Sequence, residues 1–306
     1  MVTKSALLYL SRQEGLKDFA TKFSPFKRLT TRFVAGENLE EAVRTIRQIN
    51  TRGCTASFDH LNESVTDPAE TENEVREYLN VLARIDQTAI RSNVSIKLTQ
   101  LGLEIDPDLA YSNARQIVVD AARRGNFVRI DMEGSNVTQL TIDVFKWLRA
   151  EFGLDDVGIV LQSYLFRTMD DARDLLKLPA RIRLCKGAYD EPPKVAFPNK
   201  KDVDQNYVRV MRLLLSSGVY HGIATHDPRM IDATINYAER EKIGKDAFEF
   251  QMLYGVRRDL QDQLAEDGYN LRIYVPYGKY WYPYFMRRLA ERPANLWFVV
   301  RNLLRG

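Results

Sequence analysis

Cysteine and histidine are scarce in this 306-residue sequence, which contains two cysteines, Cys54 and Cys185, and three histidines, His60, His221 and His226. Two cysteines exclude a dense disulfide framework, and we expect Cys185, inside an apolar run, to be a small core residue. The histidines lack the spacing of metal ligands, so a metal site is not expected. Neither a G-x-G-x-x-G motif nor a P-loop occurs. A phosphate of any ligand would therefore have to be held by basic side chains, backbone N–H groups and a helix N-terminus.

Charge of one sign and long hydrophobic runs are also lacking. The 44 basic and 41 acidic residues give a formal net charge of +3, which is too balanced to predict nucleic acid as the main partner. No run approaches the roughly 20 apolar residues of a membrane span. Residues 1–10 lack a signal-peptide cleavage site, so we expect a cytoplasmic protein. The hydrophobic content of 45% and the charged content of 28% are typical of a globular protein with one large or two ordinary domains.

Eight short apolar or alternating runs predict strands, at residues 54–58, 94–98, 127–131, 158–162, 181–186, 221–225, 248–252 and 271–275. Amphipathic stretches between them predict helices, among them residues 72–91, 107–124, 138–152, 202–217 and 229–242. Strand–helix alternation repeated eight times predicts an α/β protein with a (β/α)8 TIM-like barrel. A doubly wound open sheet is the alternative, but that fold more often carries a Gly-rich fingerprint after its first strand.

The chain is expected to form a single domain overall, because no low-complexity linker divides it. Residues 1–50 are expected to form an N-terminal helical arm, with a break at Ser24-Pro25, ahead of a catalytic barrel over residues 51–306. Helix starts are marked by Asp106-Pro107 and Asp227-Pro228, where an aspartate can cap the helix and a proline suits its first turn. Residues 293–304 predict a last, C-terminal helix.

Polar residues collect where the predicted strands end, whereas the strand interiors look apolar. Because the carboxyl ends of barrel strands converge at one face, this pattern predicts a functional site there. Asp131 is the clearest acid among several basic residues, so we expect the site to bind anions. Neither a Ser-His-Asp arrangement nor the paired carboxylates of a glycosidase are evident, which favours a cofactor that performs the chemistry. The strand-end residues are Lys97, Asp131, Gln162, Arg183, Lys186, Thr225, His226, Gln251 and Tyr274.

A helical segment near the C-terminus places Tyr284, Arg287, Arg288 and Glu291 on one face. Two adjacent guanidinium groups can grip a carboxylate with a forked geometry that lysine does not offer. Tyr284 could close over the bound group, and Glu291 could hold Arg287 in place. Taken alone, such a face has an ordinary alternative as solvated surface. The strand-end cluster favours the substrate-binding interpretation.

Several segments carry a resemblance to a known family. They are residues 32–36 (RFVAG), the SIKL run ending at Leu98, and residues 183–189 (RLCKGAY), 224–227 (ATHD), 249–255 (EFQMLYG) and 272–278 (RIYVPYG), with the helix that holds Arg287 and Arg288. In this order, and at strand ends, they resemble proline dehydrogenases, the flavin-dependent (β/α)8 enzymes that oxidise L-proline to Δ1-pyrroline-5-carboxylate. The resemblance spans nearly the whole chain and is to the short monofunctional bacterial form.

The resemblance implies a proline pocket with Lys97, Asp131 and Arg183 as the catalytic group. Arg287 and Arg288 would hold the proline carboxylate with help from Lys97, and Asp131 would orient Lys97 or the substrate. Glu291 and Glu63 would pair with the arginines. The stretch from Tyr274 to Arg287 is shorter than in the bifunctional relatives, which leaves open the roles of Tyr277, Tyr280 and Tyr282. The ring of proline would be enclosed by Tyr189, Leu253, Tyr274 and Tyr284.

The resemblance also implies a flavin, FAD with FMN as the alternative. Arg183 would lie near the reactive N5 edge, and Gly187 would let the backbone approach the cofactor closely. The flavin-binding residues would be Gln162, Arg183, Lys186, Gly187, Ala188, Thr225, His226 and Gln251.

The same resemblance implies partners beyond the substrate. Electrons would pass to a quinone-type acceptor, which implies peripheral contact with the cytoplasmic face of the inner membrane. The amphipathic tail with Trp297 and Phe298 is a candidate for that contact, and a helix packed on the barrel is the alternative. Pyrroline-5-carboxylate dehydrogenase would be a downstream partner.

Alternative interpretations stay open at this stage. Another flavin barrel, such as a folate reductase, would not require the Arg287–Arg288 pair or the tyrosines. A proline- or flavin-binding module without turnover would keep the pocket but lack electron transfer. Asp59 and Glu63 could form a solvated pair, and His226 could be a purely structural histidine.

Overall fold

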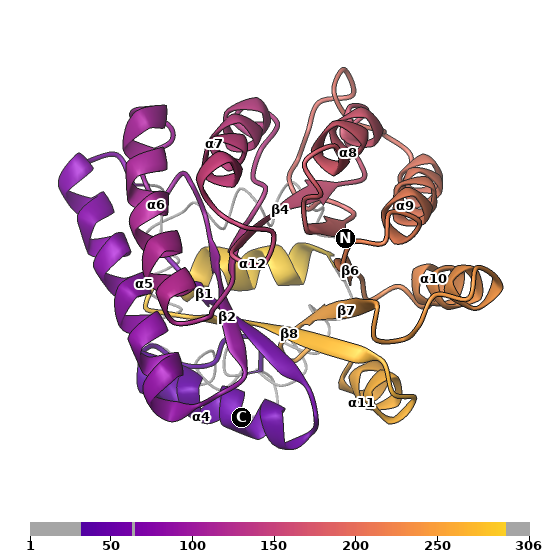
Figure 1. The fold of residues 1–306 in the computed structure, drawn as a ribbon, viewed down its shortest axis with the longest axis horizontal. Coiled ribbons are helices and arrows are strands. Elements are labelled where there is room, and N and C mark those ends of the chain that lie inside the picture. The colour runs from indigo at the N-terminus through magenta and orange to yellow at the C-terminus, as the bar shows by residue number, and fades with distance from the viewer. Residues whose placement is uncertain (1–31, 63–64, 292–306) are drawn as a thin grey trace, which may run out of the picture.

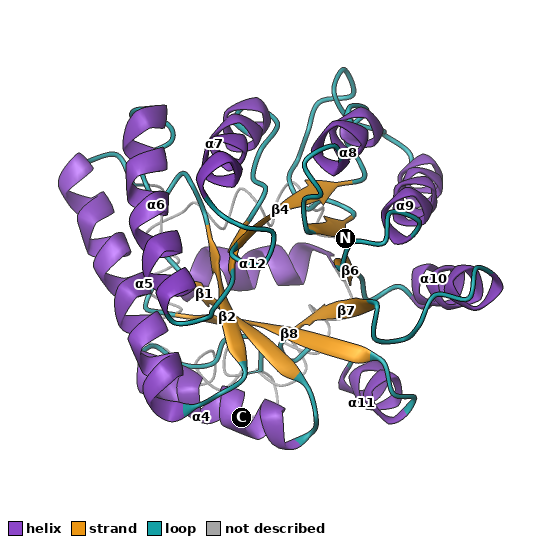
Figure 2. Cartoon of the chain, viewed as in Figure 1, coloured by secondary structure: helices purple, strands orange, loops and turns teal. Residues whose placement is uncertain are grey.

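The computed structural model describes residues 32–62 and 65–291, with side chains for all of these except residues 287 and 289–291. Eight parallel strands pair in sequence order and close into a barrel in which β8 also pairs with β1 (Figures 1 and 2). This result confirms the predicted (β/α)8 fold, and each predicted strand is present with small shifts at its ends. The strands are β1 (Thr55–His60), β2 (Ser92–Ile96), β3 (Val128–Ile130), β4 (Val157–Gln162), β5 (Ile182–Cys185), β6 (His221–Ala224), β7 (Phe248–Leu253) and β8 (Asn270–Tyr277).

Helices surround the barrel, and several begin where aspartate–proline pairs predict. Asp106 and Asp227 each accept the backbone N–H of the second helical residue, as expected of N-caps, and Asp67 does the same one helix earlier. The five predicted helices are all present. The described helices are α4 (Leu39–Thr51), α5 (Pro68–Thr88), α6 (Pro107–Arg123), α7 (Thr138–Glu151), α8 (Thr168–Leu176), α9 (Lys200–Leu215), α10 (Pro228–Arg240), α11 (Arg258–Glu266) and α12 (Trp281–Glu291).

Helix α4 precedes the first strand but packs against both β1 and β8. It buries Ala42, Val43 and Ile46 there, whereas α12, which follows β8, lies across the centre of the ring in Figure 1. Helix α4 therefore covers the strands at which the barrel closes, and α12 lies over the mouth of the barrel. The predicted break at Ser24-Pro25 and the helix over residues 293–304 lie outside the described residues.

The lumen of the barrel is polar, which corrects the expectation that the strand interiors are apolar. Side chains alternate along a strand, so Val128 and Ile130 pack into the core beneath the helices while Arg129 faces inward. Because the inward positions hydrogen-bond across the lumen, their polarity does not prevent burial. The buried inward side chains include Ser57, Asn93, Ser95, Arg129, Arg183, Glu249 and Gln251.

His221, at the start of β6, links the stability of the barrel to pH. Its side chain is fully buried, Nδ1 accepts the Ile182 N–H (3.0 Å), and Nε2 lies 2.9 Å from Ser217 Oγ. A proton on Nδ1 would break the first bond, and burial lowers the pKa of His221 to about 3. The unfolded chain would have a pKa of about 6.5 at this residue and so binds the proton first as the pH falls. Stability should therefore be lost between about pH 6.5 and pH 3.

The contribution of His221 can be measured by urea unfolding at pH 7 and pH 5. The wild-type protein is expected to lose about 1.4 kcal/mol per pH unit from this residue within that window. His221→Gln should be less stable than wild type at pH 7, because it loses hydrogen bonds, but its stability should change less between the two pH values. Equal slopes for the two proteins would contradict the assignment.

Candidate active site

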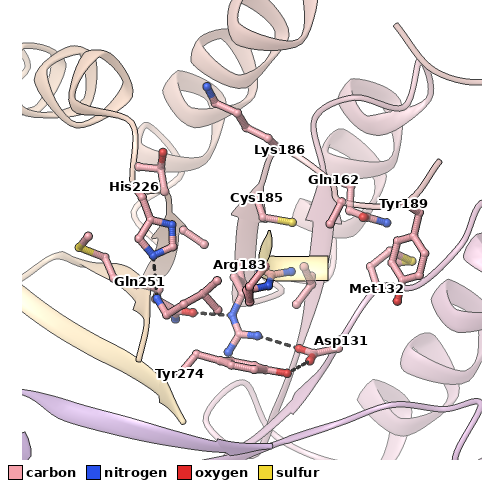
Figure 3. A pocket seen from close by; sticks show the side chains of 18 of the residues that line it. Asp131, Met132, Gln162, Arg183, Cys185, Lys186, Tyr189, His226, Gln251 and Tyr274 are labelled. Carbon is pink, nitrogen blue, oxygen red and sulfur yellow. Dashed lines mark hydrogen bonds and ion pairs between the residues drawn. The ribbon is translucent and has the colours of Figure 1, made fainter. Parts of the chain in front are cut away.

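A cavity of about 1040 Å³ opens at the carboxyl ends of the strands, and Tyr284 and Arg288 of α12 also line it. Figure 3 shows strand-end side chains of this cavity. Sequence reasoning placed a site at this face, and the structure brings together every predicted site residue whose side chain it describes. The roles assigned to these residues stay predictions. Those lining the cavity are Lys97, Asp131, Gln162, Arg183, Lys186, Gly187, Ala188, Tyr189, Thr225, His226, Gln251, Leu253, Tyr274, Tyr284 and Arg288.

Three predicted site residues cannot be placed in the same way. Glu63 lies outside the described residues. Arg287 and Glu291 belong to α12, but their side chains also lie outside the described part of the structure. The Arg287–Arg288 grip and the supporting role of the two glutamates therefore stay predictions.

Arg183 is a buried cation that two neighbours hold in one orientation. Its Nε donates to Gln251 Oε1, and its Nη1 donates to Asp131 Oδ1 at 2.7 Å. The guanidinium carbon lies 5.3 Å from the centre of the Tyr274 ring. The remaining nitrogen, Nη2, is buried without a hydrogen-bond partner among the described residues. Since Arg183 lines the cavity, it places a fixed positive charge beside any ligand there.

Asp131 connects Arg183 to two other strands. Besides the Arg183 bond, Oδ1 accepts the Ser95 hydroxyl (3.1 Å) and Oδ2 accepts the Tyr274 hydroxyl (2.7 Å), as the dashed lines in Figure 3 show for Tyr274. Burial and the Asp131 charge raise the pKa of Tyr274 well above its usual range, so the phenol stays a donor. Lys97 Nζ is 3.8 Å from Oδ2. Asp131 therefore contacts Arg183 and Tyr274 more closely than Lys97, which was its expected partner.

Asp59 is a site residue that sequence reasoning missed. It is 1% exposed, lines the cavity and accepts a hydrogen bond from Lys97 Nζ, so the solvated-pair interpretation is wrong for this residue. Burial alone would lower the pKa of Lys97, but the Asp59 and Asp131 carboxylates raise it. Burial also raises the pKa of Asp59. The predicted first strand stopped one residue before Asp59, and a longer strand would have placed this acid at a strand end.

Lys186 lies among acids at the rim, which corrects the predicted excess of basic groups. Its Nζ donates to Asp204 and, at 2.8 Å, to Asp227, and Arg229 Nη2 contacts the same two carboxylates at 2.9 and 3.0 Å. Although burial opposes it, Arg229 and Lys186 hold the pKa of Asp227 well below its usual range. Asp227 was recognised only as a helix cap, and Asp204 had no local signal at all.

His226 and Gln162 make hydrogen bonds with the loops around the cavity. His226 Nε2 accepts the Leu253 backbone N–H (2.8 Å), and Gln162 Nε2 donates to the Glu133 carbonyl (2.7 Å). Both side chains line the cavity, so neither bond excludes contact with a ligand. Cys185 also lines the cavity and is half-buried, which corrects its prediction as a core residue.

Gly187 is required for a reason that the sequence did not show. Its backbone φ of +105° is one that residues other than glycine rarely adopt. A Cβ added at this position would lie 2.4 Å from the Tyr164 ring. Gly187 also lines the cavity, so its predicted close approach to a cofactor stays a prediction.

Gly187→Ala is expected to lower the free energy of unfolding by about 3 kcal/mol or more, since backbone strain and a steric clash add. Gly53→Ala is the matched control, because Gly53 also has a positive φ (+80°) but no atom of the described residues within 4 Å of the added Cβ. Its cost should be about 1–2 kcal/mol. Urea unfolding of both variants measures the difference, and equal costs would show that the Tyr164 contact is unimportant.

Neither a metal site nor a membrane-spanning helix is found among the described residues. No group of three or more His, Cys, Asp or Glu side chains could hold a metal ion in the described part of the chain. No helix within residues 32–62 and 65–291 is long and apolar enough to cross a membrane.

The comparisons with known proteins agree on one family. The family model for proline dehydrogenase matches residues 42–301. Proline dehydrogenase 2 of Bacillus subtilis is 42% identical over 99% of both chains, and the proline dehydrogenase of Deinococcus radiodurans is 44% identical over 91% of both chains. The crystal structure of proline utilization A from Bdellovibrio bacteriovorus, inactivated by N-propargylglycine, matches 87% of this chain with a TM-score of 0.81 and 26% identity. This chain covers 33% of that larger protein.

Proposed function

Since this chain belongs to the proline dehydrogenase family, we propose that it oxidises L-proline to Δ1-pyrroline-5-carboxylate with a flavin bound in the cavity. The observation that carries the proposal is Arg183, a cavity-lining cation held by Asp131 and Gln251 whose Nη2 has no partner among the described residues. A flavin ring carries carbonyl oxygens and ring nitrogens that can accept such a donor. The cavity volume, about 1040 Å³, also exceeds what a ligand the size of proline needs.

The residues that would hold the flavin come from several strand ends, so each of them taken alone gives little evidence of flavin binding. FAD is the proposed flavin and FMN is the alternative. Analysis of the cofactor released from the protein would distinguish the two. The cavity-lining residues proposed to contact it are Gln162, Arg183, Lys186, Gly187, Ala188, Thr225, His226 and Gln251.

The other side chains are proposed to position proline. When bound, a flavin would supply the hydride acceptor for the ring carbon next to nitrogen. Arg288 would hold the carboxylate, and Tyr189, Leu253 and Tyr274 would restrict the ring to one orientation. Lys97 is ion-paired with Asp59 and its pKa is raised, so it contributes positive charge and does not serve as a base.

Three further proposals rest on the family resemblance alone. They are a quinone-type electron acceptor, contact of the C-terminal tail with the membrane, and a pyrroline-5-carboxylate dehydrogenase downstream. Trp297 and Phe298, the residues implicated in membrane contact, lie outside the described residues.

The proposal is tested by the visible spectrum of the purified protein before and after addition of L-proline without oxygen. We expect a flavin spectrum that bleaches with L-proline but not with pyrrolidine, which lacks the carboxylate. A flavin that stays oxidised would favour another flavin enzyme or a binding module. A protein that carries no flavin and cannot be reconstituted with it would refute the proposal.

A further inference from the structure

A chain of three side chains connects the interior of the barrel to Arg183. Arg272 Nε donates to Glu249 Oε1 at 2.8 Å, and Gln251 Nε2 donates to the same oxygen at 2.5 Å. Gln251 Oε1 then accepts from Arg183 Nε, the contact visible in Figure 3. These residues come from β8, β7 and β5, so the contacts run along one side of the barrel wall and end at the cavity.

The two neighbours of Gln251 determine the orientation of its amide group. A guanidinium group only donates hydrogen bonds, and an ionised carboxylate only accepts them. The carbonyl of Gln251 must therefore face Arg183, and its NH₂ group must face Glu249. Glu249 and Gln251 are each 4% exposed, so water cannot readily replace either bond.

Arg272 keeps Glu249 able to accept. Burial opposes the ionisation of Glu249, but the Arg272 charge and hydrogen bond lower its pKa overall. Arg272 is itself held by the Ala56 carbonyl (2.7 Å), and Tyr220 donates to the other carboxylate oxygen at 3.3 Å. The acceptor that faces Gln251 is thus an anion fixed from two sides.

We propose that Glu249 is a positioning residue for Arg183 and acts through the orientation of the Gln251 amide. The inference rests on the proposed function, in which Arg183 contacts the flavin. Asp131 holds Nη1 and Gln251 holds Nε, so Nη2 keeps one direction only while both contacts persist. Without Glu249, the NH₂ group of Gln251 loses its acceptor, so the amide is no longer held from the far side and its carbonyl holds Arg183 Nε less firmly.

Glu249→Gln is a control rather than the test, because its carbonyl can take the place of Oε1 and accept from both Arg272 and Gln251 while its NH₂ group faces the Tyr220 hydroxyl. Glu249→Met tests the idea, because methionine has a similar length but offers no acceptor to Gln251. Compared with wild type, we expect FAD to bind the apoprotein about tenfold more weakly or kcat to fall by about tenfold or more. The KM for L-proline should change little, because the carboxylate contacts are untouched. The midpoint potential of the bound flavin should become more negative, because the cation is less well placed.

The double variant E249M/R272M keeps the test open if the single variant does not fold, because it removes both charges of the buried ion pair rather than one. Gln251 still loses its acceptor, so FAD affinity and kcat should fall as in Glu249→Met. Tyr220→Phe is the matched control: it removes a hydrogen bond to Glu249 but leaves the Gln251 amide as it is, and it should behave as wild type.

The outcomes separate this inference from the proposed function. FAD affinity, potential and kcat of Glu249→Met equal to those of wild type would overturn the inference alone. Wild-type protein that binds FAD but is not reduced by L-proline would refute the proposed function, while FAD affinity and potential would still decide the inference. Wild-type protein that binds no flavin would overturn both. If Glu249→Met does not fold, E249M/R272M decides: weakened FAD binding supports the inference, and wild-type FAD binding overturns it.

Discussion

Asp131→Ala is expected to lower kcat for L-proline by about a hundredfold or more. The carboxylate accepts from Arg183, Tyr274 and Ser95, so its loss leaves a buried guanidinium with one described partner fewer. Removing one partner of a buried ion pair costs about 3–5 kcal/mol, because the other charge stays buried and uncompensated. We therefore also expect a lower melting temperature for the apoprotein. Steady-state kinetics and thermal unfolding measure the two effects.

Two further substitutions separate the charge of Asp131 from its hydrogen bonds. Ser95→Ala removes only the neutral 3.1 Å hydrogen bond to Oδ1 and should lower kcat by less than about tenfold. Asp131→Asn retains an acceptor for Arg183 but not the charge, and should fall between the other two variants. If Asp131→Ala has no larger effect than Ser95→Ala, Asp131 does not hold Arg183 in a functional orientation.

Arg288→Lys is expected to raise the KM for L-proline by about tenfold or more while the protein retains its flavin. Arg288 lines the cavity, and its guanidinium carbon lies 5.1 Å from the centre of the Tyr284 ring. Lysine keeps the charge but lacks the planar fork that binds both oxygens of a carboxylate and stacks on an aromatic ring. The inhibition constant of cyclopentanecarboxylate, a ring acid without the nitrogen, should rise in parallel.

Arg257→Lys is the matched control for Arg288. Arg257 also lines the cavity, but Asp259 already accepts from its Nε and Nη2 at 2.8–3.0 Å. Since that guanidinium is committed, its replacement should leave the KM nearly unchanged. If Arg288→Lys retains its flavin and has the wild-type KM for L-proline, Arg288 does not bind the carboxylate of proline.

The location of the site could be predicted because the end of a strand can be recognised from a few neighbouring residues. Gln162 and Gln251 were selected as polar residues at the ends of apolar runs, and both line the cavity. Asp59 was missed because the first strand was predicted to end at Phe58, whereas it continues to His60. Cys185 was assigned to the core because its run is apolar, but alternation directs it inward to the cavity.

The partners of these residues were not predictable in the same way. Arg183 and Asp131 were expected in different roles, one at the flavin and one at the substrate, yet they form an ion pair with Nη1 and Oδ1 at 2.7 Å. Lys186 was expected to meet an anionic ligand but already contacts Asp204 and Asp227. Asp204 lies within α9, where an acid is an ordinary surface residue.

Local patterns in the chain were enough to predict the eight strands, the helices capped by Asp106 and Asp227, and the face of the barrel at which polar residues collect. Periodicity and capping act over a few residues, so they can be recognised without the fold. Which charges meet depends on the folded barrel, because those pairs join strands far apart in the chain. The polar lumen depends on it too, since Arg129 and Glu249 are stable inside only when neighbouring strands of the barrel supply their hydrogen-bond partners.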